Sequence, residues 1–316
     1  FNADRPLTIL DIGANDGTLL KLLDRRHRRV AFEPSNIVPD NVDYTFQDYF
    51  AAELFLERYK AADLIFSIAM FYDVDDPNSF VADIKRILAP DGVWVVQMND
   101  IASMVAHTAF DFVGHEHTCI YSLRSFQRLL APHGLTIFKA ERNEVNGGSI
   151  RMFVGHKGQR LIETSLWRAL GWERGVLEAR GTPIARLIEF GVKVSSLCLR
   201  LHNMVAVETG GREDVYIYAA STRGSTILQA AQLNEQHIAA AAERDPHKWG
   251  NLVPGTAIPM MTEQEARAAR PGYFLALPYS YMPQFIQREQ EFLLRGGKFI
   301  VPLPEPRFVG KEALNG

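Results

Sequence analysis

The chain has 316 residues and a formal net charge of −3, and 47% of its residues are hydrophobic while 22% are charged. This length predicts about two domains, and the composition is typical of a globular enzyme. The charge offers no basic field for nucleic acid or an anionic membrane, no apolar run is long enough to span a bilayer, and two cysteines are too few for a disulfide scaffold. We therefore expect a cytoplasmic protein that acts on a small molecule; the oligomeric state stays open.

Up to about residue 158, short apolar runs alternate with amphipathic stretches. The runs "LTILDIG", "RVAFEP", "ADLIFSIAM" and "GVWVVQMN" are almost wholly apolar, as parallel strands buried on both faces are. Stretches such as "NSFVADIKRIL" fall between them and indicate βαβ units. We expect "GGSIRMFVGHK" to form the last strand, antiparallel and at the sheet edge. The sequence thus predicts a doubly wound α/β domain over residues 1–158.

The rest of the chain changes character twice. Residues 159–211 show long helical periodicity, broken at Gly181-Thr182-Pro183, and are predicted to connect two domains. After the polar break "ETGGRED", the runs "VYIYAAS", "YFLALPYS" and "KFIVPLP" alternate with helical stretches. We therefore expect a smaller C-terminal α/β domain over residues 212–316.

A glycine turn follows the first predicted strand, in "LTILDIGANDGTLLKLL". Gly13 and Gly17 permit a tight turn at a helix start, and Glu33 follows Asp11 by 22 residues, where a carboxylate can accept both ribose hydroxyls of a nucleoside. The spacing departs from G-x-G-x-x-G, which argues against a pyrophosphate on the turn. An NAD-dependent sugar dehydrogenase or epimerase is therefore the weaker functional alternative. The alternative without a bound nucleoside is an ordinary strand-to-helix connection with a surface acid.

A nucleoside site with neither phosphate-binding motif points to S-adenosylmethionine, which carries adenosine without phosphates. Here the sequence begins to resemble class I methyltransferases. Asp48 either accepts from the adenine amino group or caps a helix. The expected cofactor-binding residues are Asp11, Gly13, Asn15, Asp16, Glu33, Asp48 and Ser67.

Later stretches sharpen the resemblance: "FDFVGHEHTCIYSLRSFQRLL", "NEVNGGSIRMFV", "RDPHKWGNLVPGTAIPM" and "GGKFIVPLP". In this order, and over nearly the whole chain, they resemble the sugar C-methyltransferases that methylate nucleotide-linked 4-keto-deoxyhexoses at C3. The resemblance implies a class I methyltransferase Rossmann-like domain, a smaller C-terminal α/β domain, an acceptor between them and a specialised bacterial pathway. Many members carry an N-terminal zinc-binding segment, which this sequence lacks.

The family chemistry needs a base for the proton on the carbon beside the ketone. The resemblance assigns that role to His117, whose imidazole type titrates near neutrality. Glu116 would orient that ring or bind the sugar. Tyr121 would donate to the enolate oxygen or pack, and Tyr72 is a further phenol near the site.

Two positions depart from the family pattern. Asp73 stands where a histidine is usual, and Gly114 where a tyrosine is usual. Methylation of an oxygen, a nitrogen or a non-sugar carbon therefore stays open, as does a protein that binds a nucleotide-sugar without methyl transfer. On a strand, His115 and His117 would face the same side, but no further ligand has local spacing, so we expect no metal. A structural role, with the histidines satisfied in a sheet-edge turn, also stays open.

The acceptor is expected to contact both halves of the chain. Ser221, Arg223 and Gly224 stand between a strand and a helix, where an anion such as a diphosphate is favoured, although a plain turn with a solvated arginine is equally compatible. Family likeness adds Lys248. Asn146 and Ser149, in "NGGS", either line the sugar pocket or bulge an edge strand.

Overall fold

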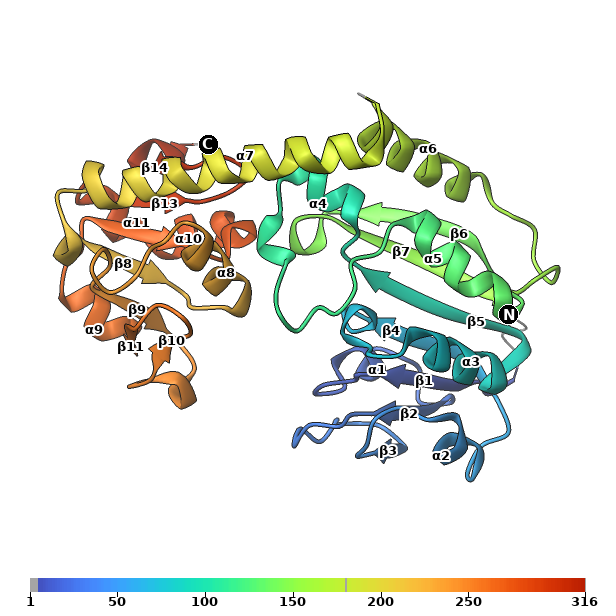
Figure 1. The fold of residues 1–316 in the computed structure, drawn as a ribbon. Coiled ribbons are helices and arrows are strands. Elements are labelled where there is room, and N and C mark those ends of the chain that lie inside the picture. Colours follow the sequence, from blue (N-terminus) through green and yellow to red (C-terminus); the bar gives the residue numbers. More distant parts are fainter. Residues whose placement is uncertain (1–4, 180, 316) are drawn as a thin grey trace. The chain divides into compact units, whose positions relative to one another are not determined.

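The computed structural model describes residues 5–179 and 181–315 and shows two compact units (Figure 1). One unit contains the chain up to Ser103 together with Glu116–Ala179, and the other contains Met104–His115 together with the chain after Ala179. Each unit combines helices with a sheet that contains parallel and antiparallel strands, so the predicted α/β fold class is confirmed. Within the described ranges, no helix has both the length and the apolar character needed to cross a membrane.

The first unit is built on a seven-stranded sheet in the order β3-β2-β1-β4-β5-β7-β6. Its strands are β1 (Thr8–Ile12), β2 (Arg28–Phe32), β3 (Tyr44–Phe46), β4 (Ala62–Ile68), β5 (Leu88–Met98), β6 (Leu135–Asn143) and β7 (Ser149–His156). β7 runs antiparallel to both of its neighbours, as predicted. Its predicted place at the sheet edge is wrong, because β7 pairs with β5 as well as β6 and leaves β6 at the edge.

Helices cover this sheet because each presents an apolar side to it. They are α1 (Thr18–Lys21), α2 (Ala52–Leu56), α3 (Pro77–Ile87), α5 (Leu123–Leu130) and α6 (Thr164–Glu178). Figure 1 shows α3 and α5 side by side on the same face. Beneath them, Phe71, Trp94 and Phe126 form an aromatic layer with ring centroids 5.1 to 5.9 Å apart. This layer supports the loop after β4, which carries Tyr72 and Asp73.

The second unit has its own seven-stranded sheet, in the order β10-β11-β9-β8-β12-β13-β14. Its strands are β8 (Val215–Tyr218), β9 (Ala240–Glu243), β10 (Leu252–Val253), β11 (Ile258–Thr262), β12 (Tyr273–Ala276), β13 (Lys298–Val301) and β14 (Arg307–Val309). The five inner strands are parallel, and the two edge strands are antiparallel to their neighbours.

Helices lie on both faces of the second sheet. They are α7 (Pro183–Asn203), α8 (Thr222–Ala230), α9 (Glu263–Ala268), α10 (Met282–Arg288) and α11 (Gln290–Leu294). Leu201 of α7 and Ile227 of α8 share one apolar cluster, while Ala266 and Phe292 belong to another. Residues 159–211, predicted to connect two domains, contain α6 in the first unit and α7 in the second. α4 (Ile101–His107) begins in the first unit and ends in the second.

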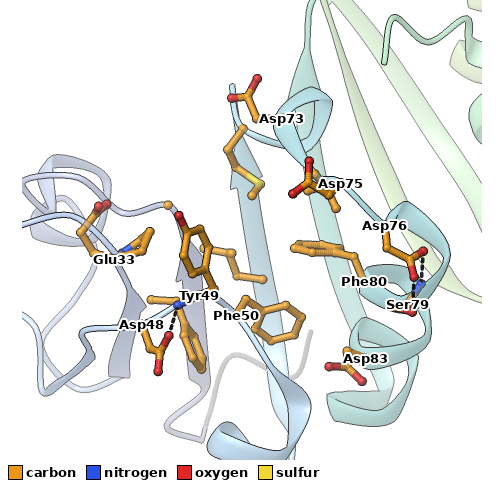
Figure 2. A pocket seen from close by; sticks show the side chains of 16 residues that line it. Glu33, Asp48, Tyr49, Phe50, Asp73, Asp75, Asp76, Ser79, Phe80 and Asp83 are labelled. Carbon is orange, nitrogen blue, oxygen red and sulfur yellow. Dashed lines mark hydrogen bonds between the residues drawn. The ribbon is translucent and has the colours of Figure 1, made fainter. Parts of the chain in front are cut away.

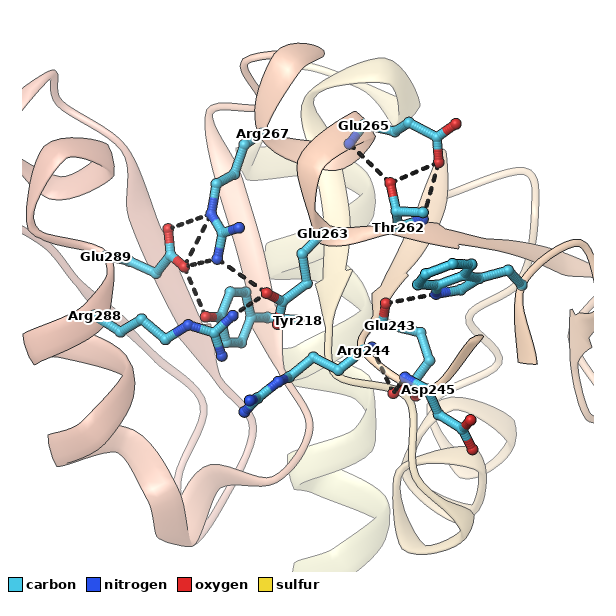
Figure 3. Close-up of polar contacts among 11 residues, drawn as sticks. Tyr218, Glu243, Arg244, Asp245, Thr262, Glu263, Glu265, Arg267, Arg288 and Glu289 are labelled. Atoms are coloured by element: carbon cyan, nitrogen blue, oxygen red, sulfur yellow. Dashed lines mark hydrogen bonds and ion pairs between the residues drawn. The ribbon is translucent and has the colours of Figure 1, made fainter. Parts of the chain in front are cut away.

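A charged network stabilises the second unit (Figure 3). Glu289 is 4% exposed and accepts hydrogen bonds from the Tyr218 hydroxyl, at 2.7 Å, and from the Arg267 guanidinium. Burial, together with the adjacent Glu289, raises the pKa of Tyr218 to about 12. Arg288 reaches Glu263, which also pairs with Arg267. These charges are paired with one another within the second unit.

Candidate active site

The turn between β1 and α1 requires glycine at two positions. Gly13 and Gly17 have φ values of 75° and 76°, a region that residues with a Cβ rarely adopt. The N–H of Gly13 donates to the carbonyl of Phe32 at the end of β2 (2.9 Å), and a Cβ on Gly17 would lie 2.8 Å from the carbonyl oxygen of Asp40. Positive φ and close backbone approach therefore explain both glycines of the motif.

Glu33 follows β2 and is fixed by two backbone groups. It is 7% exposed, and its carboxylate oxygens accept the N–H groups of Asn15 (2.7 Å) and Ser35 (3.0 Å). Burial opposes the charged form, but the hydrogen bonds from Ser35 and Asn15 outweigh it and lower the pKa of Glu33. Glu33 is thus a rigid carboxylate, and its remaining lone pairs can accept ribose hydroxyls.

A cavity of about 450 Å³ opens beside Glu33 and Gly13 (Figure 2). In Figure 2, Glu33 and Asp48 stand on one side of it, and Asp73 and Asp75 on the other. Its lining contains six carboxylates and no Lys, Arg or His. The six are Glu33, Asp48, Asp73, Asp75, Asp76 and Asp83. Because like charges gather here without a basic side chain in the lining, the cavity favours a positively charged ligand.

Aromatic residues give the same cavity an apolar side. Tyr49, Phe50 and Phe80 line it, and the carboxylate of Asp48 accepts the N–H of Tyr49 (2.7 Å). Such rings suit a flat base, since aromatic faces stack. Sequence reasoning missed these three rings, although the run "QDYF" places two of them directly after Asp48.

Gly13 also borders a second cavity, of about 730 Å³. Asp11, Asn15 and Asp16 line this one. Asp11 is 4% exposed, and burial followed by the nearby charge of Glu33 raises the pKa of Asp11 to about 7. The structure therefore divides the predicted cofactor residues between two adjoining cavities that share Gly13.

Two predicted cofactor residues make structural hydrogen bonds. The carboxylate of Asp16 accepts the N–H (2.9 Å) and the hydroxyl (2.8 Å) of Thr18 at the start of α1. Ser67 is fully buried, and its hydroxyl oxygen accepts the indole N–H of Trp94 at 3.0 Å. Ser67 lines neither cavity, so the structure does not bring it to the other cofactor candidates.

The histidine cluster lies in a turn of the loop before α5. His115 and Glu116 form that turn, and His117 follows in irregular backbone, so the strand geometry considered for a metal site is wrong. Among residues 5–179 and 181–315, no group of three or more His, Cys, Asp or Glu side chains could hold a metal ion. His117 must therefore be considered on its own contacts.

His117 is held against the loop that follows β4. Its ring packs edge-on against Tyr72, with centroids 4.4 Å apart, and its Nε2 lies 3.9 Å from Oδ1 of Asp73. The next two residues fix the backbone, because the Thr118 hydroxyl (3.1 Å) and the Cys119 N–H (3.2 Å) both donate to the Tyr72 carbonyl. Since Asp73 lines the first cavity, these contacts bring the predicted base to its rim.

Tyr121 lies in the aromatic layer. It is 8% exposed, and its ring centroid is 5.4 Å from that of Phe71 and 5.9 Å from that of Phe126. Burial, followed by the Cys119 thiol, raises the pKa of Tyr121. Of the two roles considered for Tyr121, the structure shows the packing one.

The "NGGS" segment forms a tight connection between β6 and β7. The Ser149 hydroxyl donates to the Val145 carbonyl (2.8 Å), and the Asn99 side chain donates to the Gly148 carbonyl (2.7 Å). Ser149 is 2% exposed, so its hydroxyl serves the turn. The side chain of Asn146 lies outside the described part of the structure.

In the second unit, the predicted anion site is the start of α8. The Ser221 hydroxyl oxygen caps the helix by accepting the Gly224 N–H (3.0 Å). A Cβ on Gly224 would lie 2.7 Å from the Leu277 side chain, so close packing against that residue requires this glycine. Helix capping and packing thus account for Ser221 and Gly224.

Both cations expected to bind a diphosphate are paired with carboxylates. Arg223 lies 2.7 Å from Asp111, which is 2% exposed and also accepts from the Tyr279 hydroxyl at 3.3 Å. Lys248 lies 3.3 Å from Glu243. An anion at either cation would compete with a carboxylate already in place.

Comparisons with known proteins agree with this geometry. A methyltransferase domain family matches residues 1–140, and a C-methyltransferase C-terminal domain family matches residues 144–304, just over half of the chain. C-methyltransferase NovU of Streptomyces niveus is 29% identical over 314 residues, covering 96% of this chain and 74% of that protein.

Two solved methyltransferase structures resemble the chain only over about half its length. The 1,6-didemethyltoxoflavin-N1-methyltransferase of Burkholderia thailandensis, bound to S-adenosylhomocysteine, is 17% identical with a TM-score of 0.38, covering 48% of this chain and 72% of that one. The methyltransferase complexed with the Trm112 activator of Haloferax volcanii is 14% identical with a TM-score of 0.40, covering 49% and 85%. Both scores are below 0.5, so the assignment rests on the two families and the curated relative.

S-adenosylmethionine fits the cavities beside the glycine turn. Glu33 is a fixed carboxylate of the kind that ribose hydroxyls can donate to, the aromatic side suits adenine, and the carboxylates suit the positively charged sulfonium and ammonium groups. The chain therefore belongs to the C-methyltransferases and is a methyltransferase that uses S-adenosylmethionine.

Proposed function

We propose that the protein methylates a carbon beside a ketone, most closely on a nucleotide-linked ketosugar, with His117 as general base. The observation that carries this proposal is the position of His117. It packs on Tyr72 and lies near Asp73 at the rim of the cavity of about 450 Å³ beside Glu33, which we call the donor cavity. A general base must be held where it can reach the acceptor's proton beside the methyl donor, and the contacts of His117 with two residues at the cavity rim support such a role.

The chain's own groups then have distinct tasks. S-adenosylmethionine supplies an electrophilic methyl group. His117 removes the proton that makes the acceptor carbon nucleophilic, Tyr72 fixes the imidazole ring, and Glu116 contacts the acceptor or His117. Glu33 binds the ribose, and Asp48 accepts from the adenine amino group. Cytoplasmic location stays a prediction.

A second candidate follows from the ion pairs of the second unit. Because Arg223 and Lys248 already face Asp111 and Glu243, an acceptor without a diphosphate would leave both pairs intact. Asp73 and Gly114, at the positions where the resembled family has His and Tyr, also leave room for different chemistry. The candidate is methyl transfer to an oxygen, a nitrogen or a non-sugar carbon.

Solvent exchange tests the base directly. The wild type is incubated in D₂O with a nucleoside diphosphate 4-keto-6-deoxyhexose, with and without S-adenosylmethionine, beside His117→Gln and the control His133→Gln. We expect deuterium at the carbon next to the ketone and a methylated product, both reduced about 100-fold or more in His117→Gln only.

Each outcome separates the candidates. Turnover by His117→Gln near that of the wild type would exclude the base role. Methylation of a simpler carbon, oxygen or nitrogen acceptor in place of the ketosugar would establish the second candidate. Donor binding with no transfer to any acceptor would indicate a binding protein.

A further inference from the structure

We propose that Asp73 is a positioning residue for His117: its carboxylate orients the imidazole and stabilises the imidazolium that forms when His117 takes the acceptor's proton. This inference rests on the proposed function of His117. It gives a role to a residue that departs from the pattern of the resembled family.

The backbone holds the two side chains together. Asp73 ends a short helical turn, Phe71–Asp73, after β4, and Phe71 of that turn is fully buried in the aromatic layer. The hydrogen bonds from Thr118 and Cys119 to Tyr72 tie the histidine loop to the same turn. Asp73 and His117 therefore face each other from two segments that are joined to one support.

The side chains themselves are suitably placed. The His117 side chain is 10% exposed, and that of Asp73 is 41% exposed and lines the donor cavity. The 3.9 Å between Nε2 and Oδ1 is within ion-pair range, and catalytic contacts that are long in a ligand-free protein often tighten in the reacting complex. Tyr72 packs against the ring edge and restricts its rotation.

The charges around Asp73 support its pairing with His117. Burial raises the pKa of Asp73 to about 6, His117 opposes that rise, and Glu116 adds to it. Glu33 and Asp75 face the same cavity. Asp73 is consequently ionised near neutral pH, yet its charge depends on the state of His117.

The reaction step balances without a further reagent. The proton moves from the acceptor carbon to the imidazole, and the electron pair it leaves forms the new carbon–carbon bond to the methyl group. The carbon–sulfur bond breaks with its electron pair on sulfur, which becomes neutral. Asp73 gains and loses no atom; it faces the positive charge that arises on His117.

A titration that needs no acceptor tests the contact. Carbon NMR of the Asp73 carboxyl, assigned with Asp73→Asn, is followed against pH in the wild type, in His117→Gln and in the control His115→Gln. Because the imidazolium favours the charged carboxylate, we expect the Asp73 titration to move upward by about half a pH unit or more in His117→Gln alone. Identical titrations in all three folded proteins would overturn the proposal.

Kinetics test the consequence once an acceptor is turned over. Asp73→Asn should lower kcat by about 10- to 100-fold, part of what a general base contributes, and move the acid limb of the pH–rate profile to lower pH. Asp73→Glu should restore part of kcat. Asp75→Asn, which removes a neighbouring carboxylate of the cavity, should change only KM for S-adenosylmethionine.

The two proposals fail in different ways. An active His117→Gln enzyme refutes the base role. An inactive His117→Gln enzyme, combined with an Asp73→Asn variant whose kcat and pH profile are unchanged, refutes only the positioning role.

Discussion

Both units contain paired carboxylates, such as Asp100 with Arg142 in the first, but only the first has a described cavity lined by many acidic side chains. In the second unit, Glu289, Asp111 and Glu243 each face a basic side chain, so their charges are satisfied inside the protein. In the first, six carboxylates line a cavity whose lining has no basic residue. The difference teaches that the cavity lining keeps an excess of acidic side chains, although Asp83 pairs with Arg86 outside the lining (3.2 Å) and Asp76 caps α3, and such an acidic lining favours a cationic ligand.

Removing the buried carboxylate of Glu289 in the second unit should cause the largest loss of stability. Glu289→Ala leaves the Tyr218 hydroxyl and the Arg267 guanidinium without their shared acceptor, which should cost about 3 kcal/mol. Hydrogen exchange of β8 and β12 measures the loss. Glu291→Ala, on the exposed side of α11, should cost less than about 0.5 kcal/mol, and donor binding should survive in both. Lost donor binding would contradict the division of labour between the units.

A buried carboxylate of the first unit should show the opposite effect on stability. The pKa of Asp11 is about 7 in the folded chain against a usual 3.8, so the folded state binds more protons between these pH values and stability falls as pH rises. Asp11→Asn should therefore gain about 2 kcal/mol relative to the wild type between pH 5 and pH 8 in urea unfolding.

Asp63→Asn is the matched control for that pH dependence. Burial opposes the charged form of Asp63, but the hydrogen bonds from Arg5 and Thr8 together outweigh it and lower the pKa, so this carboxyl is ionised in both states over the same range. Its replacement should have the same cost at pH 5 and at pH 8. An Asp11→Asn difference that does not change with pH would show that Asp11 is charged in the folded protein.

Glu33, the proposed ribose acceptor, should affect donor binding. Glu33→Gln removes the charge and replaces one oxygen that accepts a backbone N–H by an amide group that donates, so affinity for S-adenosylhomocysteine should fall about tenfold, or about 1.4 kcal/mol. Isothermal titration calorimetry measures this. Glu53→Gln removes an exposed carboxylate outside both cavities and should leave the affinity unchanged. Equal affinities for Glu33→Gln and the wild type would remove Glu33 from the site.

Structural features that depend on neighbouring residues could be predicted from the sequence, whereas contacts between distant residues could not. The tight turn at Gly13 and Gly17 and the position of Glu33 after the next strand could be predicted. The residues that indicate them all lie within two successive strands and the turn between them. The pairing of Arg223 with Asp111, 112 positions away, could not, since nothing in the local pattern indicates that Met104–His115 packs in the second unit. At His115 the sequence left a strand and a turn open, because alternating residues fit both, and the structure shows the turn.

The smallest expected effect is on donor affinity, and it distinguishes a contribution from the charge of the donor cavity from one due to its shape. Asp75 is exposed and lines the cavity, so Asp75→Asn removes a charge without disturbing buried contacts. S-adenosylmethionine carries one more positive charge than S-adenosylhomocysteine, so we expect its affinity to fall about twofold while that of the product stays constant. Calorimetry at low salt should show this difference, and about 0.5 M salt should abolish it through screening. An equal loss for both ligands would mean that Asp75 acts through contact, and the acidic lining would then not distinguish the donor from its product.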